Sequence, residues 1–246
     1  MTSTCIGCGC TDMHACFDEK ANTGCHWLEV NREQALGVCS CCSKWLNVWH
    51  AGYRGPDHPF VGKYSPWIKL SVSGQRFYFL EPEKHAYNIL DIAHSLAQIN
   101  RFNGHCKFPY SVAQHSWTVS LMVPKEDALA GLLHDGVEAY TGDVTGPLKC
   151  LLPDYKVIEF IIARAIYKWF NLPAELPASV KEADMIMLAT ELHHLMPRDP
   201  EYWLHTSPYS PLEQPIRQMT PDMAEQIFLG RYLELTKQEA VACLPG

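Results

Sequence analysis

The fold is decided by residues 130–149, which read A-G-L-L-H-D-G-V-E-A-Y-T-G-D-V-T-G-P-L-K. Their apolar start predicts a helix over residues 125–140 that carries the adjacent pair His134 and Asp135. Glu138 follows this pair at spacings of four and three, so a second carboxylate is expected on the same helical face. Glycine and proline residues after position 141 then break the helix. The loop that they form is expected to hold Asp143 and Lys149 near the helix end, facing one cleft.

A metal ion bound by His134 and Asp135 needs further ligands, because one imidazole and one carboxylate do not fill the coordination sphere of a divalent ion. Two candidates lie on other predicted helices. His115 lies one turn into a helix that begins with the S-x-x-Q capping box of residues 111–114. Asp184 lies in a helix predicted over residues 179–196, which begins with a second capping signal at Ser179. A single helical His or Asp is more often structural than a ligand, so the interpretation depends on the four residues together.

The order H, then HD, then D, each on a separate predicted helix, resembles the HD superfamily of metal-dependent phosphohydrolases. The resemblance covers residues 73–197. It is carried by I-N-R-F at 99–102, A-Q-H-S at 113–116, L-L-H-D-G-V-E at 132–138, T-G-D-V-T-G-P-L-K at 141–149 and K-E-A-D at 181–184. These motifs look like those of bacterial 5'-deoxynucleotidases. They look still more like those of short phage HD phosphohydrolases, including phage enzymes that strip triphosphate from dATP. The resemblance implies that His115, His134, Asp135 and Asp184 are the metal ligands.

The resemblance also implies the substrate contacts. Arg101 stands near the sequence position at which the family has its phosphate-binding arginine. A planar guanidinium suits this role because it can bind two phosphate oxygens at once. Without the resemblance, an exposed arginine at a helix C-terminus is an equally good interpretation. Phe102 stands where the deoxynucleotidases have a Trp beside the sugar, which weakens the expectation of 2'-deoxy selectivity. The family's counterpart of Asp143 lies by the sugar and the scissile phosphate, which implies substrate positioning or catalysis. Lys149 is expected to offset phosphate charge, and Glu138 to transfer a proton through water.

A divalent ion held by these four ligands would activate water and polarise a phosphoryl oxygen at neutral pH. Mixed His and carboxylate ligation suits Mn, Co, Zn or Fe. We therefore expect hydrolysis of a deoxynucleotide substrate in phage nucleotide-pool control, either as a dNTP (dATP-like) triphosphohydrolase or as a dNMP 5'-phosphatase. Two alternatives stay open: a nucleotide-binding sensor or adaptor without turnover, and a phosphodiesterase acting on RNA or a cyclic nucleotide. The phosphodiesterases often use a second ion, for which His94 and His105 are near enough in sequence.

The later predicted helices have two further features. Glu191 lies seven residues after Asp184 and is expected on the same helical face. An ordinary charged helix residue is the favoured interpretation of Glu191, and a partner of the metal ligands is the alternative. The helix expected over residues 154–170 carries an apolar face for packing and no visible chemistry.

Cysteine is concentrated at the start of the chain, where eight of the eleven cysteines lie in the first 42 residues. Residues 1–10 have neither the basic start nor the apolar run of a secretion signal, so reduced thiols that bind metal are favoured over disulfides. The C-x-x-C spacings at 5–8 and 39–42 match the paired hooks of a tetrahedral zinc site, and further cysteines, His14 and His26 are available for a second ion. An iron–sulfur cluster and disulfides stay open as alternatives. The expected ligands of this structural metal are Cys5, Cys8, Cys10, Cys16, Cys25, Cys39 and Cys42.

The sequence predicts three parts: a cysteine-rich metal-binding module at residues 1–45, a packed linker at 46–66 and an HD phosphohydrolase domain at 67–246. The last part begins with a β-hairpin in which residues 67–72 and 75–80 alternate about Ser73 and Gly74. Further helices are expected after Asn88 and after Thr220, each of which can cap a helix. The predicted fold class is mainly α: an HD-domain helical bundle preceded by a short β-hairpin and a small cysteine-rich metal-binding module.

Composition limits the partners. A chain of 246 residues with 47% hydrophobic and 19% charged residues is typical of a globular protein. No run of eighteen apolar residues occurs, so a membrane is not expected as a partner. The expected location is the cytoplasm, or the host cytoplasm if the chain is phage-encoded. The net charge is -7, and residues 1–42 hold two Lys/Arg against five Asp/Glu, so duplex nucleic acid is not an expected partner. The resemblance implies a homo-oligomer.

Overall fold

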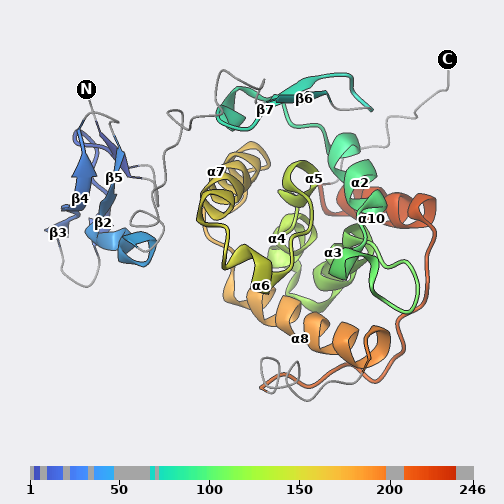
Figure 1. Ribbon diagram of the computed structural model, residues 1–246. Helices are drawn as coiled ribbons and strands as arrows, with labels where there is room; N and C mark the ends of the chain where they lie inside the picture. The colour runs from blue at the N-terminus through green and yellow to red at the C-terminus, as the bar shows by residue number, and fades with distance from the viewer. Residues whose placement is uncertain are drawn as a thin grey trace. The chain divides into compact units, whose positions relative to one another are not determined.

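The computed structural model describes residues 3–5, 10–18, 23–32, 36–46, 67–69, 72–197 and 208–236. The chain divides into two compact units, one of residues 1–67 with 146–160 and one of residues 68–145 with 161–246. The described part is mainly helical, with short strands and a cysteine cluster (Figure 1). None of the helices in the described part combines the length and the apolar character that crossing a membrane requires. The predicted linker falls almost entirely outside the described residues, and the predicted domain boundaries stay predictions.

The first unit contains a small sheet with the strand order β1-β5-β4 and a separate strand pair β2-β3. The elements are β1 (Thr4–Cys5), β2 (Phe17–Asp18), β3 (Thr23–Gly24), β4 (Trp27–Asn31), β5 (Leu36–Cys39) and the 3-10 helix η1 (Ser40–Trp45). β5 pairs in parallel with β1 and antiparallel with β4. A Cβ added at Gly37 of β5 would lie 2.6 Å from the carbonyl oxygen of Glu29 in β4, so only glycine allows this approach. The buried core of the described part of this unit is Val38 surrounded by cysteines.

The second unit carries a bundle of helices around α3 (Figure 1). Its elements are η3 (Pro82–Lys84), α2 (Ile89–Gln98), η4 (Arg101–Gly104), α3 (Val112–Met122), η5 (Lys125–Asp127), α4 (Ala128–Leu133), α5 (Glu138–Thr141), α8 (Ala178–Leu195) and α10 (Pro221–Thr236). α3 contacts α2, α4, α8 and α10. Val180, Ala183 and Met187 of α8 pack against Val119 of α3 and Ala130 of α4. This packing brings one side of α8 against the two helices that carry the predicted histidines.

The predicted helix caps at Asn88, Ser111 and Thr220 are confirmed. Each side-chain oxygen accepts a backbone N–H two or three residues further on, at 3.0, 3.2 and 3.3 Å respectively. The cap predicted at Ser179 is wrong. α8 begins one residue earlier, and the Ser179 hydroxyl donates instead to the carboxylate of Asp127.

The continuous helix predicted over residues 125–140 is also wrong, because it is interrupted at the His-Asp pair. α4 ends just before His134, and the N–H of Glu138 donates to the carbonyl of Asp135 at 2.9 Å, a three-residue spacing. The carbonyl of His134 accepts instead from the hydroxyl of Tyr167 at 2.9 Å. A hydrogen bond from a distant helix thus satisfies the backbone oxygen at the interruption.

After α5 the backbone turns at Gly142, which has a φ of +79° that favours glycine. The prediction that Gly146 and Pro147 lie in a helix-breaking loop is wrong, because they begin the short helix α6 (Gly146–Lys149). Proline is well tolerated in a first helical turn, where its missing N–H has no intrahelical partner. Lys149 therefore lies on a helix, which is followed by α7 (Pro153–Trp169).

The predicted hairpin is present as β6 (Trp67–Lys69) paired with β7 (Arg76–Tyr78). β7 is shorter than the predicted 75–80, and Gly74 before it has a φ of +70°. The N–H of Ser73 donates to Asp91 Oδ1 of α2 at 2.8 Å. The connection is therefore fixed to the first helix of the bundle.

An aromatic cluster joins β7 to α5. The ring centroid of Phe77 lies 5.1 Å from that of His85 and 4.2 Å from that of Tyr140. His85 is 6% exposed. Burial lowers the pKa of His85, and the charge of Asp91 and the backbone carbonyl of Arg76 oppose this shift without cancelling it.

Candidate metal centres

Four side chains of the helical unit converge on one point. They come from α3 (His115), from the turn after α4 (His134 and Asp135) and from α8 (Asp184). The two histidine Nε2 atoms are 3.3 Å apart. Asp135 Oδ2 lies 3.2 Å from His134 Nε2 and 3.6 Å from His115 Nε2. Asp184 Oδ1 lies 3.2 Å from His115 Nε2 and 3.9 Å from His134 Nε2, next to both histidines. The group whose ligand atoms all lie within 4.8 Å of one another is His115, His134 and Asp135.

The hydrogen bonds on the far side of each imidazole define which nitrogen carries the proton. His134 Nδ1 donates to the carbonyl of Gly131 at 2.8 Å, since a carbonyl can only accept. His115 Nδ1 donates to the carboxylate of Glu191 at 2.6 Å. A neutral imidazole with its proton on Nδ1 has a lone pair on Nε2. In this tautomer, two imidazole nitrogens and the neighbouring carboxylate oxygens can accept a cation between them.

The spacing of these atoms suits a divalent metal ion. Metal–ligand bonds of about 2.1 Å place neighbouring ligand atoms about 3.0 to 3.4 Å apart in octahedral or tetrahedral coordination. The shortest separations among the four acceptor atoms are 3.2 and 3.3 Å. Two carboxylates also balance the charge of a divalent ion. The His and Asp residues of the helical unit could therefore hold a metal ion.

The electrostatics of the cluster favour positive charge. Burial lowers the pKa of His134, but the carboxylates of Asp135 and Asp184 outweigh burial and raise it well above its ordinary value. Burial raises the pKa of both carboxylates, but the two imidazoles outweigh it and hold both values below the ordinary range. The attraction that retains a proton in this cluster acts equally on a metal cation.

Arg101 lies beside the cluster, held there by its backbone. Its N–H donates to the carbonyl of Tyr110, just before α3, at 2.9 Å. Its Nη1 lies 3.5 Å from Asp135 Oδ2, and its guanidinium carbon is 5.7 Å from the ring centroid of Phe102. Phe102 and Asn103 have φ values of +53° and +52°, a left-handed conformation that strains a large side chain. Such strain is concentrated at ligand sites in proteins.

Glu191 is the residue of this centre that sequence reasoning missed. Its side chain is fully buried. One carboxylate oxygen accepts from His115 Nδ1 at 2.6 Å, and the other lies 2.9 Å from both Nε and Nη2 of Arg101. Burial raises the pKa of Glu191, but Arg101 and then His115 outweigh burial and lower it below the ordinary value. The interpretation of Glu191 as an ordinary charged helix residue is therefore wrong. The signal in the sequence was its spacing of seven residues from Asp184, which placed both carboxylates on one helical face.

Two other predicted residues flank the cluster. Glu138 is 4% exposed, and its N–H donates to the carbonyl of Asp135. Asp143 lies between α5 and α6. Burial lowers the pKa of Arg101, but Glu191, Asp135 and Asp143 together raise it well above its ordinary value. The charge of Asp143 thus reaches the predicted phosphate-binding arginine.

Lys149 and His94 have carboxylate partners. Lys149 belongs to the first unit, where its Nζ lies 2.6 Å from Glu159 Oε1. Its role toward phosphate stays a prediction. His94 Nδ1 lies 3.0 Å from Glu225 Oε2 of α10. This contact weakens the interpretation of His94 as a ligand of a second ion.

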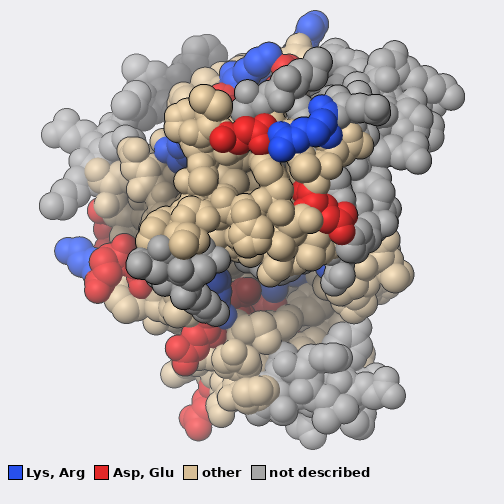
Figure 2. Space-filling model, turned by 90° about the vertical axis from the view of Figure 1, so that its left-hand side faces the viewer, with Lys and Arg blue, Asp and Glu red and all other residues tan. Residues whose placement is uncertain are grey.

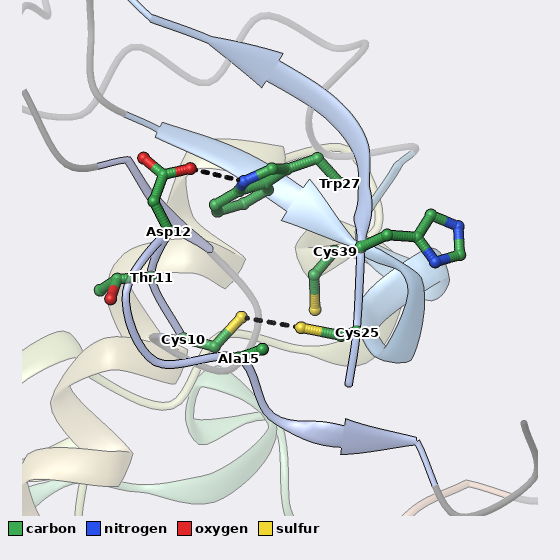
Figure 3. A pocket seen from close by; sticks show the side chains of 8 residues that line it. Cys10, Thr11, Asp12, Ala15, Cys25, Trp27 and Cys39 are labelled. Carbon is green, nitrogen blue, oxygen red and sulfur yellow. Dashed lines mark hydrogen bonds between the residues drawn. The ribbon is translucent and has the colours of Figure 1, made fainter. Parts of the chain in front are cut away.

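The first unit holds a second candidate centre. Among the described cysteines, two groups each have all their sulfur atoms within 4.8 Å of one another, namely Cys10, Cys16, Cys25 and Cys39, and Cys5, Cys39 and Cys42. In the first group, the Sγ atoms of Cys10 and Cys25 are 3.5 Å apart (Figure 3). The fourth member of this group is Cys39, so the expectation of His14 or His26 as its ligand is replaced. Cys8, also predicted, lies outside the described residues.

The segment after Cys10 is fixed by a network around Asp12. The carboxylate accepts from the backbone N–H of Ser3 at 2.7 Å, from Trp27 Nε1 at 2.8 Å and from Arg32 Nη1 at 2.7 Å (Figure 3 draws the Trp27 bond). The hydrogen bond from Arg32, followed by those from Ser3 and Trp27, lowers the pKa of Asp12 to about 2. These bonds tie three separate segments together around the cysteines.

Charges on the surface do not form a single block in the view of Figure 2. The described Lys and Arg side chains on that face are interspersed with Asp and Glu. A duplex nucleic acid is bound mainly through its phosphates, which needs a continuous basic surface. The expectation that duplex nucleic acid is not a partner therefore stays the better prediction.

The fold and its two sets of ligands define a mainly helical protein with residues able to hold metal ions. No protein-family model matches the chain. The uncharacterized protein YfdR of Escherichia coli K12 is 41% identical over 169 residues, which are 68% of this chain and 94% of YfdR. The uncharacterized protein RCAP_rcc00048 of Rhodobacter capsulatus is 36% identical over 127 residues, which are 48% of this chain and 64% of that protein. The chain belongs to the same family as YfdR.

Proposed function

We propose that the helical unit is an HD-type metal-dependent phosphohydrolase that acts on deoxynucleotides. The observation that carries this proposal is that His115 Nε2 and His134 Nε2 lie 3.3 Å apart and that an oxygen of Asp135 and an oxygen of Asp184 each lie within 3.9 Å of both nitrogens. The chain order of these residues is H, HD, D, on separate elements, as in the HD superfamily that the sequence resembles.

The cluster can hold one divalent ion, and Mn, Co, Zn or Fe suits its ligands. Such an ion supplies Lewis acidity toward a phosphate ester and its attacking water. Arg101 presents Nη1 next to the cluster, where it can bind a phosphate oxygen, and Glu191 holds the guanidinium in place through its other nitrogens. Glu138, whose backbone N–H donates to the carbonyl of Asp135, is proposed to accept or return a proton.

The substrate is a deoxynucleoside triphosphate or monophosphate. Asp143, which acts electrostatically on Arg101, is assigned to positioning the sugar beside the phosphate. Phe102 adjoins the guanidinium of Arg101, which supports the proposal that its ring lies beside the sugar. The contact of His94 with Glu225 favours a one-ion hydrolase over a two-ion phosphodiesterase. Control of a nucleotide pool, by a homo-oligomer in the cytoplasm, is the setting that the resemblance supports.

A product assay tests the proposal. The purified chain is incubated with Mn or Co and each dNMP and dNTP, with the matching ribonucleotides as controls, and nucleoside, phosphate and triphosphate are separated by chromatography. Release of triphosphate identifies a triphosphohydrolase, and release of phosphate from monophosphates identifies a 5'-nucleotidase. Asp135→Asn should abolish either activity, whereas Glu225→Gln on α10 should leave it unchanged. Absence of turnover in protein that retains its metal and binds nucleotides would refute the hydrolase and favour the sensor.

A further inference from the structure

One cysteine belongs to both sulfur groups of the first unit. Cys39 lies within 4.8 Å of the three sulfurs of Cys10, Cys16 and Cys25 and, separately, of the two sulfurs of Cys5 and Cys42. We propose that this unit binds two zinc ions that share the Cys39 thiolate as a bridging ligand. The sequence alone indicates two separate sites, each built on its own cysteines. The structure assigns both ions to one binuclear centre.

The sulfur spacing in the first group fits one tetrahedral ion. With Zn–S bonds of about 2.3 Å, neighbouring sulfurs of a tetrahedron lie about 3.8 Å apart. The Sγ atoms of Cys16 and Cys39 are 3.8 Å apart, and those of Cys10 and Cys25 are 3.5 Å apart. A disulfide would bring two sulfurs to about 2.0 Å. The cysteines of this group are therefore placed as ligands around a common centre and not as bonded pairs.

An iron–sulfur cluster fits the same spacing poorly. In a [4Fe–4S] cluster each cysteine binds a different iron, and in a [2Fe–2S] cluster two cysteines bind each iron, so in either cluster some cysteine sulfurs belong to different irons that inorganic sulfides separate. The cysteine sulfurs must then lie on the outside of the cluster, well beyond the distance between two ligands of one ion. All four sulfurs of the first group lie within 4.8 Å of one another, which leaves room for a single ion.

The second group is built around the same cysteine. The backbone N–H of Cys39 donates to Cys5 Sγ at 3.4 Å, a contact that stabilises a thiolate. Cys42 follows Cys39 at the C-x-x-C spacing, with its backbone in η1 directly after β5. Cys5, Cys39 and Cys42 are 2%, 1% and 6% exposed. Three buried sulfurs from β1, β5 and η1 thus meet on the side of Cys39 that carries the second ion.

Sharing one thiolate also reduces the charge that has to be buried. Two divalent ions with these six thiolates carry a net charge of -2, whereas the same groups of four and three thiolates with no cysteine in common would carry -3. The desolvation cost of buried charge rises steeply with its size. Among the described residues, the apolar partners that pack with these cysteines are Val38 and the partly buried Trp27 and Leu46. A binuclear centre therefore supplies the cohesion that this small apolar core lacks.

Metal counting on cysteine variants of the full chain tests the shared ligand. Zinc per chain is measured after desalting for the wild type and for Cys16→Ser, Cys42→Ser and Cys39→Ser. The first two variants should each lose one ion relative to the wild type, and Cys39→Ser should lose two. Cys41→Ser is the matched control, because Cys41 is an exposed neighbour outside both groups, and it should lose none. Loss of a single ion from Cys39→Ser would overturn the shared ligand.

If every variant unfolds and loses both ions, a measurement on the wild-type protein tests whether the two ions share a ligand. The full chain is loaded with cadmium-113 and its cadmium spectrum recorded. Two resonances in the thiolate-rich range, joined by a cadmium–cadmium correlation through the common sulfur, are expected. An ion at the His and Asp ligands of the helical unit resonates in a different range and does not interfere. A single thiolate resonance, or two without a correlation, would overturn the binuclear centre.

Discussion

Replacing Glu191 by alanine would remove the link between a metal ligand and the predicted phosphate-binding arginine. Glu191 is fully buried and pairs with both Arg101 and His115. Removing one partner of a buried ion pair costs about 3–5 kcal/mol, because the remaining charge is left without compensation. Arg101 keeps a second carboxylate, Asp135, at 3.5 Å, and its side chain is 11% exposed. We therefore expect Glu191→Ala to lower the free energy of unfolding by about 3 kcal/mol, the lower end of that range.

Glu191→Gln separates the structural role from the role at the metal. The amide oxygen of glutamine can still accept the proton of His115 Nδ1, but the negative charge is lost. A weaker acceptor makes the imidazole a poorer ligand, and changes at such supporting residues typically lower metal affinity about 10- to 100-fold. We expect this loss in affinity for Mn together with a smaller loss of stability than in Glu191→Ala.

The assay combines urea unfolding in the presence of a chelator with competition titration of the metal. Glu182→Gln, an exposed position on the same helix, is the matched control and should change neither quantity. Wild-type Mn affinity in Glu191→Gln, combined with a large loss of stability in Glu191→Ala, would show that Glu191 acts only in folding. Wild-type values of both quantities in both variants would refute the buried network altogether.

Four further outcomes are expected. Asp135→Asn should abolish metal retention at the helical unit without unfolding it, as measured by elemental analysis and circular dichroism; retained metal would contradict the assigned ligands. Tyr167→Phe should lower the free energy of unfolding by about 1 kcal/mol, because the hydroxyl that donates to the His134 carbonyl is lost, and urea denaturation measures this. Burial lowers the pKa of His85 in the folded protein below its value of about 6.5 in the unfolded chain. At a pH between the folded and the unfolded pKa, the unfolded state binds more protons, so the free energy of unfolding rises with pH in that range. His85→Phe should flatten that part of the stability profile, recorded with saturating metal, and an unchanged profile would refute the assignment. Chelation should unfold the first unit before the second, seen as early proteolysis near the N-terminus with helical dichroism retained.

The sequence predicted where His115, His134 and Asp135 lie along the chain because their positions follow local rules. A capping box places His115 one turn into its helix, and adjacency places His134 next to Asp135. The caps at Asn88 and Ser111, which involve only neighbouring residues, were predicted for the same reason. Structural features that depend on three or four successive residues can be predicted from the sequence.

Features that depend on distant partners left no such pattern. The interruption at His134 is supported by Tyr167, 33 residues further on, and Arg101 meets Glu191 across 90 residues. The sharing of Cys39 depends in the same way on β1 reaching β5. Spacing showed that these residues could take part in chemistry, but only the tertiary fold determines which ones meet.

The two candidate metal centres differ in how much the surrounding fold depends on their ligands. In the helical unit, apolar residues such as Val119 and Met187 form a core of their own, and the metal ligands are brought together at its edge. That unit can lose its ion and keep its structure, which is what a site for exchangeable chemistry needs. In the first unit the cysteines themselves are the core around Val38, so an ion there holds the structure together. This difference supports the proposal that the His and Asp cluster is the reactive site and that the cysteines have a structural role.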